Sequence, residues 1–312
     1  MGTFVICGSG FDPYENLAVE EALLDRVGPE DMILYLWQNE RTVVIGKNQN
    51  AWKECRAAEL AADGGRLARR SSGGGAVYHD LGNLNFSFVA GAGVYDVARQ
   101  TGVVLRALQN LGIPAERTGR NDLLAAGRKF SGNAYLQKKD RACHHGTLMV
   151  DVDAARVERY LSPPRAKLAA KGVDSVRARV INLVELLPGL DCARLARALE
   201  AAFAAEYGPA QRLSVADLDQ AKVRQLRDRY ASEAWRFGAR FEAAMTVAGR
   251  LDWGNAELQL QLQGQTVTAA RLYTDALDET LPPRLEQALI GSSLADPATW
   301  PSALSPLLRQ CI

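Results

Sequence analysis

The sequence predicts an α+β fold, because segments with helical spacing and segments with strand-like alternation both occur along the chain. Residues 12–27 have helical spacing and begin with Asp12 and Pro13, a typical helix-start pair. Residues 83–88 instead alternate apolar and polar side chains, as a half-buried strand does. A chain of 312 residues with this mixture is long enough to bury a sizeable core.

The same patterns predict the other elements. Further helices are expected at about residues 52–62, 94–111, 190–207 and 215–230. Further strands are expected at residues 1–7, 32–37, 42–45, 128–135, 146–152, 258–263 and 267–273, with one more ending at Arg70. We expect the second and third of these strands to pair as a hairpin, and the last two numbered strands to pair across Gly264-Gln265.

The texture of the sequence changes near Ala239, where helical segments give way to alternating Leu and Gln residues. This change predicts a domain boundary. We expect a large domain over residues 1–239 and a small sheet-plus-helix domain over residues 240–312.

Composition and charge exclude several functional classes. The 37 Lys and Arg residues nearly balance 36 Asp and Glu, so nothing favours nucleic acid or an anionic membrane as a partner. No apolar run approaches ~18 residues, so we expect no membrane span. The five scattered cysteines argue against a disulfide framework and for a reducing cytoplasm. The first residues lack the features of a signal peptide and are expected to form a strand.

A Gly-rich stretch follows the basic pair Arg69 and Arg70, and three consecutive glycines occupy residues 73–75. Glycines let the backbone approach a ligand closely and turn its N–H groups toward an anion. The two arginines are expected to add bidentate hydrogen bonds to the same anion. No lysine follows Gly75, so the stretch is not a Walker loop, and Tyr78 stands where a dinucleotide fingerprint needs glycine.

The residues after the glycines predict a ligand pocket. Leu84, Phe86 and Phe88 are expected to face the core, while Asn83, Asn85 and Ser87 line the opposite side of the same strand. A hairpin with an incidental basic rim would explain the glycines alone. The amide-lined strand beside them favours a binding site instead.

Several motifs, in order along most of the chain, resemble those of lipoate-protein ligases within the lipoate and biotin ligase family. The motifs are RRSSGGGAVYHDLGN at 69–83, GRND at 119–122, RKFSGNAY at 128–135, HHGT at 144–147 and KGVDSVRARV at 171–180. The resemblance implies a mixed-sheet catalytic domain with a small C-terminal α+β accessory domain. It also implies a loop around residues 167–180 that closes over an adenylate.

The activity implied by the resemblance has two steps. Lipoate is first condensed with ATP, assisted by Mg²⁺, to give lipoyl-AMP and pyrophosphate. The lipoyl group is then transferred to a lysine of a lipoyl domain in a 2-oxoacid dehydrogenase complex or in the glycine cleavage H protein. Both the carboxylate and the α-phosphate are anionic, so the first step needs positioning and positive charge. Preference for lipoate over octanoate stays open, since both carry an apolar tail and a carboxylate.

The resemblance also assigns roles to individual residues. Lys129 is the catalytic candidate, because it aligns with the lysine that contacts both carboxylate and nucleotide, and Asp122 is the candidate Mg²⁺ ligand. ATP contacts are implied at Arg70, Gly75, Ala76, Val77, Tyr78, Asn83, Lys129 and Arg179. Contacts to the acyl substrate are implied at Ser72, Gly73, Gly74, Gly75, His79, Lys129 and His145. On an expected strand, Lys129 and Ser131 share a face, and Trp37 is expected to help wall the pocket.

Two other functions remain open on the sequence. Cys143, next to His144 and His145, is a candidate nucleophile for an octanoyl or lipoyl transferase that acts from a carrier thioester. A non-catalytic carrier-binding protein of the same fold is the third possibility. His79, His144 and His145, with Cys143 adjacent to the last two, also invite a zinc site, but the sequence supplies no second ligand pair for it.

Overall fold

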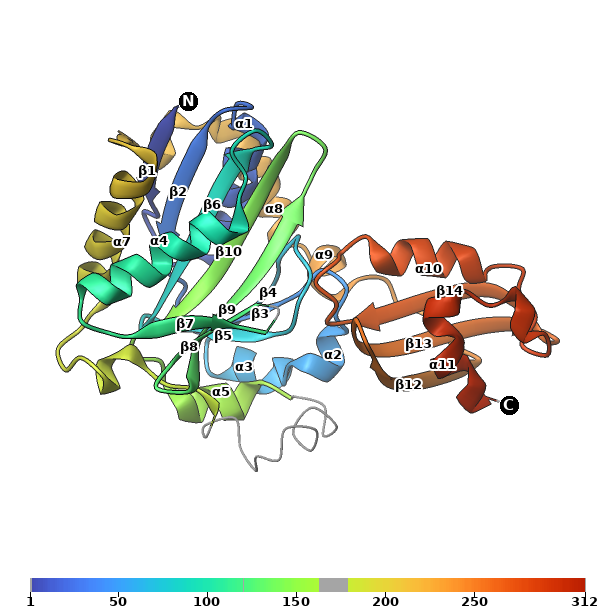
Figure 1. The fold of residues 1–312 in the computed structure, drawn as a ribbon. Coiled ribbons are helices and arrows are strands. Elements are labelled where there is room, and N and C mark those ends of the chain that lie inside the picture. The colour runs from blue at the N-terminus through green and yellow to red at the C-terminus, as the bar shows by residue number, and fades with distance from the viewer. Residues whose placement is uncertain (1, 120, 163–178, 312) are drawn as a thin grey trace.

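The computed structural model shows that the predicted α+β class is correct, with one large mixed sheet at its centre (Figure 1). The structure describes residues 2–119, 121–162 and 179–311. The sheet contains β1 (Thr3–Cys7), β2 (Met32–Trp37), β6 (Asn83–Gly91), β7 (Ala115–Thr118), β8 (Asp122–Ala125), β9 (Arg128–Gln137), β10 (Arg141–Met149) and β11 (Gln211–Leu213). Their order across the sheet is β11-β1-β2-β6-β10-β9-β8-β7. Strands β11, β1 and β2 run parallel, and the remaining neighbours are antiparallel.

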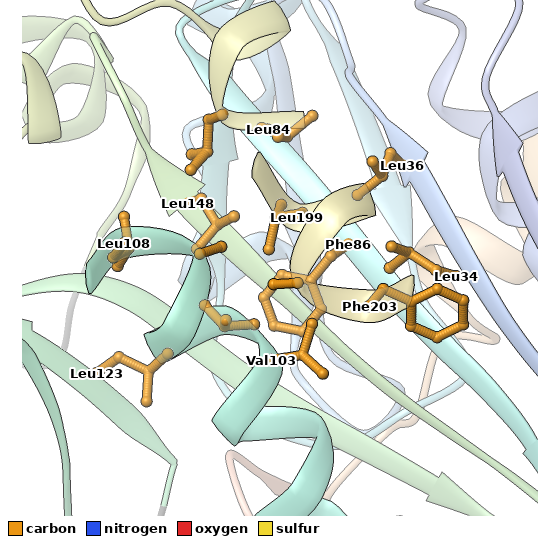
Figure 2. Close-up of a cluster of buried hydrophobic side chains, with 14 of the residues drawn as sticks. Leu34, Leu36, Leu84, Phe86, Val103, Leu108, Leu123, Leu148, Leu199 and Phe203 are labelled. Atoms are coloured by element: carbon orange, nitrogen blue, oxygen red, sulfur yellow. The ribbon is translucent and has the colours of Figure 1, made fainter. Parts of the chain in front are cut away.

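One face of this sheet is covered by α4 (Val97–Asn110) and α7 (Cys192–Tyr207). Figure 2 shows Phe86 of β6 pointing into a cluster that includes Val103 from α4 and Phe203 from α7. Phe88 and Leu84 belong to the same cluster, as their alternation predicts. All of these side chains are buried. Burying such residues contributes roughly 1.5–3 kcal/mol each, so this face anchors the central strands.

The opposite face packs against α1 (Pro13–Arg26) and α8 (Gln220–Ala231). Asp12 accepts a hydrogen bond from the Tyr14 N–H at 2.9 Å, and this cap confirms the predicted helix start. The helix α8 is shorter than predicted, because its cap is Asp219 and the preceding residues form a separate 3-10 turn. This second face of the sheet carries the polar side chains of β6.

A second sheet of three strands lies over this polar face, in the order β4 (Arg66–Arg69), β3 (Thr42–Ile45) and β5 (Val77–His79). The predicted hairpin of residues 32–37 with 42–45 is wrong. Strand β2 pairs with β1 and β6 of the large sheet, whereas β3 pairs with β4 and β5. Short helices cover the far side of the small sheet: α2 (Ala51–Glu54), α3 (Ala57–Ala62) and α5 (Ala154–Tyr160). The single helix expected at 52–62 is therefore two helices.

The C-terminal residues form a three-stranded antiparallel sheet, drawn in orange and red to one side of the large sheet in Figure 1. It consists of β12 (Met245–Leu251), β13 (Gly254–Gln263) and β14 (Thr266–Thr274), with α10 (Leu281–Leu289) and α11 (Ser305–Leu308) packed on it. The predicted pairing across Gly264-Gln265 is confirmed, and β12 is an additional strand.

Other expected positions shift by a few residues. Helix α4 begins three residues later than predicted, because Asp96 caps it. His144 and His145 lie in the middle of β10, not at its entrance. The helix α9 (Glu233–Phe237) and 3-10 turns at Leu183–Glu185, Val215–Asp217, Pro297–Thr299, Ser302–Leu304 and Arg309–Cys311 complete the described elements. No helix in the described ranges is both long and apolar enough to cross a membrane.

Candidate active site

Polar side chains of three adjacent strands gather on the face of the large sheet beneath the small sheet. Ser87 pairs in register with His145, and Asn85 pairs with both Thr147 and Trp37. Directly paired residues point to the same side of a sheet. The amide- and hydroxyl-lined side predicted for residues 83–88 is therefore confirmed, and it extends onto β10 and β2.

The Gly-rich loop is held from within by Arg70, the residue that follows β4. The buried guanidinium donates hydrogen bonds to the carbonyls of Gly73 at 2.6 Å and Gly75 at 2.9 Å, and to Ser72 Oγ at 3.1 Å. Gly74 has a φ of 89°, a left-handed conformation that favours glycine. Burial lowers the pKa of Arg70 to about 10, so the group stays cationic at neutral pH.

Arg69 has a different role from the one predicted. Its guanidinium donates to the carbonyls of Gly46, Lys47 and Gln49, and to those of two residues in α9, Trp235 and Arg236. These bonds join the end of β4 to the turn after β3 and to α9. The prediction that both arginines serve one anion is wrong for Arg69, because its guanidinium is committed to these backbone carbonyls.

A chain of hydrogen bonds runs from α1 to the Gly-rich loop through His145. The Nδ1 atom of His145 lies 3.0 and 2.9 Å from the two carboxylate oxygens of Glu20, and its Nε2 lies 2.7 Å from Ser72 Oγ. Ser87 Oγ donates to Glu20 at 2.5 Å and accepts from Trp37 Nε1 at 3.0 Å. All five side chains are buried.

Glu20 is a site residue that sequence reasoning missed. Burial by itself raises the pKa of a carboxyl group, but His145 and the hydrogen bonds from His145 and Ser87 outweigh it and lower the pKa of Glu20. The carboxylate is therefore ionised at neutral pH. The only signal in the sequence is its position one turn after Asn16, on the face of α1 that carries the apolar residues toward the sheet.

His79, Asn83 and Asn85 lie next to this chain and carry buried polar atoms without a hydrogen-bond partner. These atoms are His79 Nε2, Asn83 Oδ1 and Asn85 Nδ2. The other ring nitrogen of His79 contacts Asn39 Nδ2 at 3.1 Å, and the indole of Trp37 meets the His79 ring edge-on. Buried polar atoms without partners are costly, so this group is suited to hold a polar ligand. Asn39, like Glu20, is a residue that the sequence analysis did not identify.

Lys129 lies near the start of β9, where its Nζ is 2.6 Å from Asp122 Oδ1 of β8. A Cβ on Gly132 would lie 3.0 Å from Lys129 Nζ, so this glycine leaves room for the ammonium group. Both side chains of the ion pair are only partly exposed. Ala134, two residues further along, borders Gly74 of the Gly-rich loop.

The prediction that Lys129 and Ser131 share a face is wrong. The register between β8 and β9 shifts at this point, with Leu123 opposite Ser131 and Leu124 opposite Lys129. Neighbouring residues of β8 point to opposite sides of the sheet, and each β9 residue points to the same side as its β8 partner. Ser131 therefore lies on the side of Leu123, while Lys129 lies on the side of Leu124, together with Gly132. The bulge thus brings the lysine, and not the serine, to the side of Asp122.

Cys143, His144 and His145, which the sequence offers as a possible zinc cluster, do not share one side of β10. His144 faces the other side of β10, between Gln100 and Asn133 at 3.1 and 2.9 Å. Glu20, Cys143 and His145 do place three ligand atoms within 4.8 Å of one another. Burial and Glu20 raise the pKa of the Cys143 thiol well above its ordinary value. Both ring nitrogens of His145 are hydrogen-bonded, one to Glu20 and the other to Ser72, so this cluster is satisfied as a hydrogen-bond network without a metal.

The residues that follow β14 lie against the Gly-rich loop. Gly74 N–H donates to the Ala276 carbonyl at 2.9 Å, and Gly73 packs so closely on residues 276 and 277 that a side chain would collide with their backbone. Thr274 N–H donates to the Asn48 carbonyl at 2.9 Å. The basic loop predicted at 167–180 lies outside the described residues up to 178, and the last residue of that motif, Val180, bridges Lys129.

Comparison with known proteins identifies the family. Residues 12–204 match the family model of the lipoyl protein ligase A/B catalytic domain. The chain belongs to this family. The matched part of the ligase contains the Gly-rich loop, the Glu20–His145–Ser72 chain and Lys129.

Solved structures of similar proteins support the assignment. The chain is 27% identical to LipL1 from P. falciparum, solved in complex with lipoate, with a TM-score of 0.82 and coverage of 95% of this chain and 93% of that one. It is 26% identical to a lipoate-protein ligase A bound with ATP, with a TM-score of 0.68 and coverage of 76% and 99%. It is 27% identical to a bipartite lipoate protein ligase from Thermoplasma acidophilum, solved with its E2 lipoyl domain, with a TM-score of 0.69 and coverage of 78% and 100%.

The cysteine route of acyl transfer is disfavoured in this ligase by the environment of Cys143. Replacing Cys143 with alanine is expected to leave acyl transfer within about twofold, because a neutral buried thiol is a poor nucleophile. Transfer to a lipoyl domain, followed by intact mass, measures this. Complete loss of transfer in a variant with an unchanged unfolding midpoint would restore the thioester mechanism.

The buried histidines of the ligase make its stability sensitive to acid. Burial is the main cause that lowers the pKa of both His79 and His144 to about 3. Below pH ~6.5 the unfolded chain binds protons at these residues and the folded chain does not, so stability falls by up to ~1.4 kcal/mol per pH unit for each histidine. Urea unfolding at pH 6 and pH 5 should show a loss about 1 kcal/mol smaller in His144→Gln than in the parent protein. Equal losses would contradict the lowered pKa.

Proposed function

We propose that this protein activates lipoate with ATP to form lipoyl-AMP and then transfers the lipoyl group to a lysine of a lipoyl domain. The observation that carries the proposal is the set of unpartnered buried atoms on His79, Asn83 and Asn85, next to the cationic Arg70 and the Gly-rich loop. These groups are suited to a ligand with anionic and hydrogen-bonding parts. Similar proteins have been solved with lipoate and with ATP, and this supports the same two substrates here.

In this proposal Lys129 acts in adenylate formation. Its ammonium group lies between the lipoate carboxylate and the α-phosphate, and it reduces the repulsion between the two anions. Arg70, Asn83, Arg179 and the backbone of residues 75–78 contact ATP. The acyl substrate contacts Lys129 and His79, together with Ser72, Gly73, Gly74, Gly75 and His145.

Asp122 is the proposed Mg²⁺ ligand. Its partly exposed carboxylate now pairs with Lys129 at 2.6 Å, so it lies where a cation is already accommodated. Mg²⁺ is commonly held by one or two carboxylates together with substrate phosphates, and a single Asp beside the triphosphate fits that pattern. When bound, the ion neutralises phosphate charge and polarises the phosphoryl oxygens.

The acceptor is proposed to be a lipoyl domain of a 2-oxoacid dehydrogenase E2 subunit or the H protein. A bipartite relative has been solved with its E2 lipoyl domain, which supports the first of these. We further propose a cytoplasmic enzyme divided near Ala239 into a catalytic domain of residues 1–239 and an accessory domain of residues 240–312. The protein would serve in the salvage of free lipoate.

Intact mass of a lipoyl domain tests the proposed function. The domain is incubated with the protein, lipoate and Mg-ATP, alongside a reaction without ATP and an acceptor whose lysine is replaced by arginine. We expect a lipoyl-sized mass gain only in the complete reaction. A gain from an acyl-carrier thioester without ATP, and none from free lipoate, would contradict the ligase reaction.

A further inference from the structure

The hydrogen-bond partners of Asn16 determine which ring nitrogen of His79 carries the proton. Asn16 Nδ2 lies 2.8 Å from the Gln38 carbonyl and 3.0 Å from Asn39 Oδ1, and the nitrogen is the end of an amide that donates to a carbonyl. Asn39 therefore accepts through Oδ1 and donates through Nδ2 to His79 Nδ1 at 3.1 Å. Burial lowers the pKa of His79 to about 3, so the ring is neutral and its single proton is on Nε2.

The Nε2–H group of His79 is thus a buried donor that has no hydrogen-bond partner among the described residues. Tyr78, its neighbour in β5, packs into the cluster on the far side of the small sheet, so His79 faces the large sheet. There its ring meets the indole of Trp37 edge-on, with the ring centroids 6.2 Å apart. A ligand that supplies an acceptor at this point gains the hydrogen bond that the protein leaves unmade.

A row of residues leads from Lys129 to this donor across four strands of the large sheet. Lys129 Nζ lies over Gly132, since a Cβ there would be 3.0 Å from it, and Gly132 N–H donates to Thr147 Oγ1 at 3.2 Å. Thr147 pairs in register with Asn85, and Asn85 pairs with Trp37. Adjacent strands lie about 4.8 Å apart, so the row from Gly132 to Trp37 is about 14 Å long.

We propose that His79 Nε2–H donates a hydrogen bond to a dithiolane sulfur of lipoate and thereby selects lipoate over saturated acyl chains such as octanoate. The inference rests on the proposed function, in which the lipoate carboxylate lies at Lys129. From there the four methylene groups extend across Thr147 and Asn85, and the ring reaches His79 within the length of the row.

The preference arises from the atoms that each acid places against His79. Sulfur is polarisable and accepts hydrogen bonds weakly, whereas a methyl or methylene group accepts none. In the complex with a hydrocarbon tail the buried N–H stays unpaired, while lipoate gains the hydrogen bond. The site therefore discriminates by the presence of an acceptor and not by the size of the tail.

A ring analogue without sulfur separates hydrogen bonding from shape. The intact protein is given Mg-ATP with lipoate, octanoate or cyclopentylpentanoate, in which two methylene groups replace the two sulfurs of lipoate. The value of kcat/KM for pyrophosphate release is measured with each acid, and calorimetry gives the three Kd values independently of the reaction. We expect a preference for lipoate of about 5- to 30-fold over both hydrocarbon acids. Equal use of lipoate and cyclopentylpentanoate would overturn the inference without any variant.

Two replacements of His79 test the donor itself. His79→Leu has a side chain of similar size without an N–H group, and it should reduce the preference for lipoate to less than about threefold. His79→Gln can accept from Asn39 through Oε1 and donate to the ligand through Nε2, so it should keep a larger preference than His79→Leu. Each ratio compares acids on one preparation, so a partial loss of folded protein cancels from it. An unchanged ratio in His79→Leu would contradict the role of the N–H group.

His144→Leu is the matched control, because it makes the same change at a buried histidine on the opposite side of the large sheet. The His144 ring lies between Gln100 and Asn133, away from the row. The preference for lipoate should therefore stay within about twofold of that of the intact protein.

The same measurements distinguish failure of the inference from failure of the proposed function. Equal pyrophosphate release from all three acids would overturn the selection by His79 and leave the reaction in place. No pyrophosphate release from any acid, with lipoate still bound more tightly than cyclopentylpentanoate, would contradict the proposed reaction and support the selection.

Discussion

Replacing Lys129 with alanine is expected to lower the rate of lipoyl-adenylate formation by about 10²- to 10³-fold. The ammonium group faces Asp122 over Gly132, on the part of β9 that borders the Gly-rich loop. Without it, two anions must approach each other with less positive charge between them. Lipoate-dependent pyrophosphate release in a single turnover measures this step without the acceptor protein.

Lys138→Ala is the matched control for this variant. Lys138 follows β9 at its other end and forms an exposed ion pair with Asp25 at 3.4 Å, the kind of pair that contributes little to stability. Its replacement should leave the rate within about twofold. A Lys129→Ala protein that forms the adenylate at the parent rate would remove Lys129 from the proposed mechanism.

Replacing Arg70 with alanine is expected to cost about 3–5 kcal/mol of unfolding free energy and to abolish adenylate formation. The guanidinium satisfies the carbonyls of Val44, Gly73 and Gly75 and the Ser72 hydroxyl in a fully buried position. Each buried acceptor left without a donor costs about 1–3 kcal/mol. Urea unfolding measures the stability, and pyrophosphate release measures the activity.

Two further variants make the Arg70 experiment specific. Arg70→Lys keeps the charge but lacks the planar fork that binds several carbonyls at once, so it should recover only part of the stability. Arg106→Ala removes an arginine that is half-exposed and paired with Glu206 at 3.3 Å, and it should cost less than about 1 kcal/mol. A loss in Arg70→Ala no larger than in Arg106→Ala would contradict the role of Arg70 in holding the loop.

Local patterns in the sequence predicted most elements but not their partners. The alternation of residues 83–88 predicted both the core side and the polar side of β6, because the face to which a strand side chain points follows from the two-residue period alone. The four residues between β2 and β3 look like a hairpin turn, yet the two strands belong to different sheets. Strand pairing depends on contacts between residues distant in sequence, which no local pattern records.

The parts of the candidate site that depend on glycines and charged residues could be predicted from the sequence. The Gly-rich loop, Arg70 and the lysine strand carry glycines and charges in a recognisable order. Glu20 and Asn39 could not be found this way, since a single polar residue on an apolar helix face or after a strand is ambiguous until its partner is known. The bulge that separates Lys129 from Ser131 is likewise a property of the pairing of β8 with β9.

The Ala276 carbonyl, which accepts a hydrogen bond from Gly74 N–H, competes with any ligand anion for that amide. An anion that uses this amide must first displace a neutral acceptor that is permanently tethered nearby. The apparent affinity for such a ligand is therefore the intrinsic affinity multiplied by the fraction of molecules in which residues 274–279 have left the loop. For a ligand that binds this amide, the contacts of residues 276 and 277 with the loop would therefore raise the concentration needed to fill it.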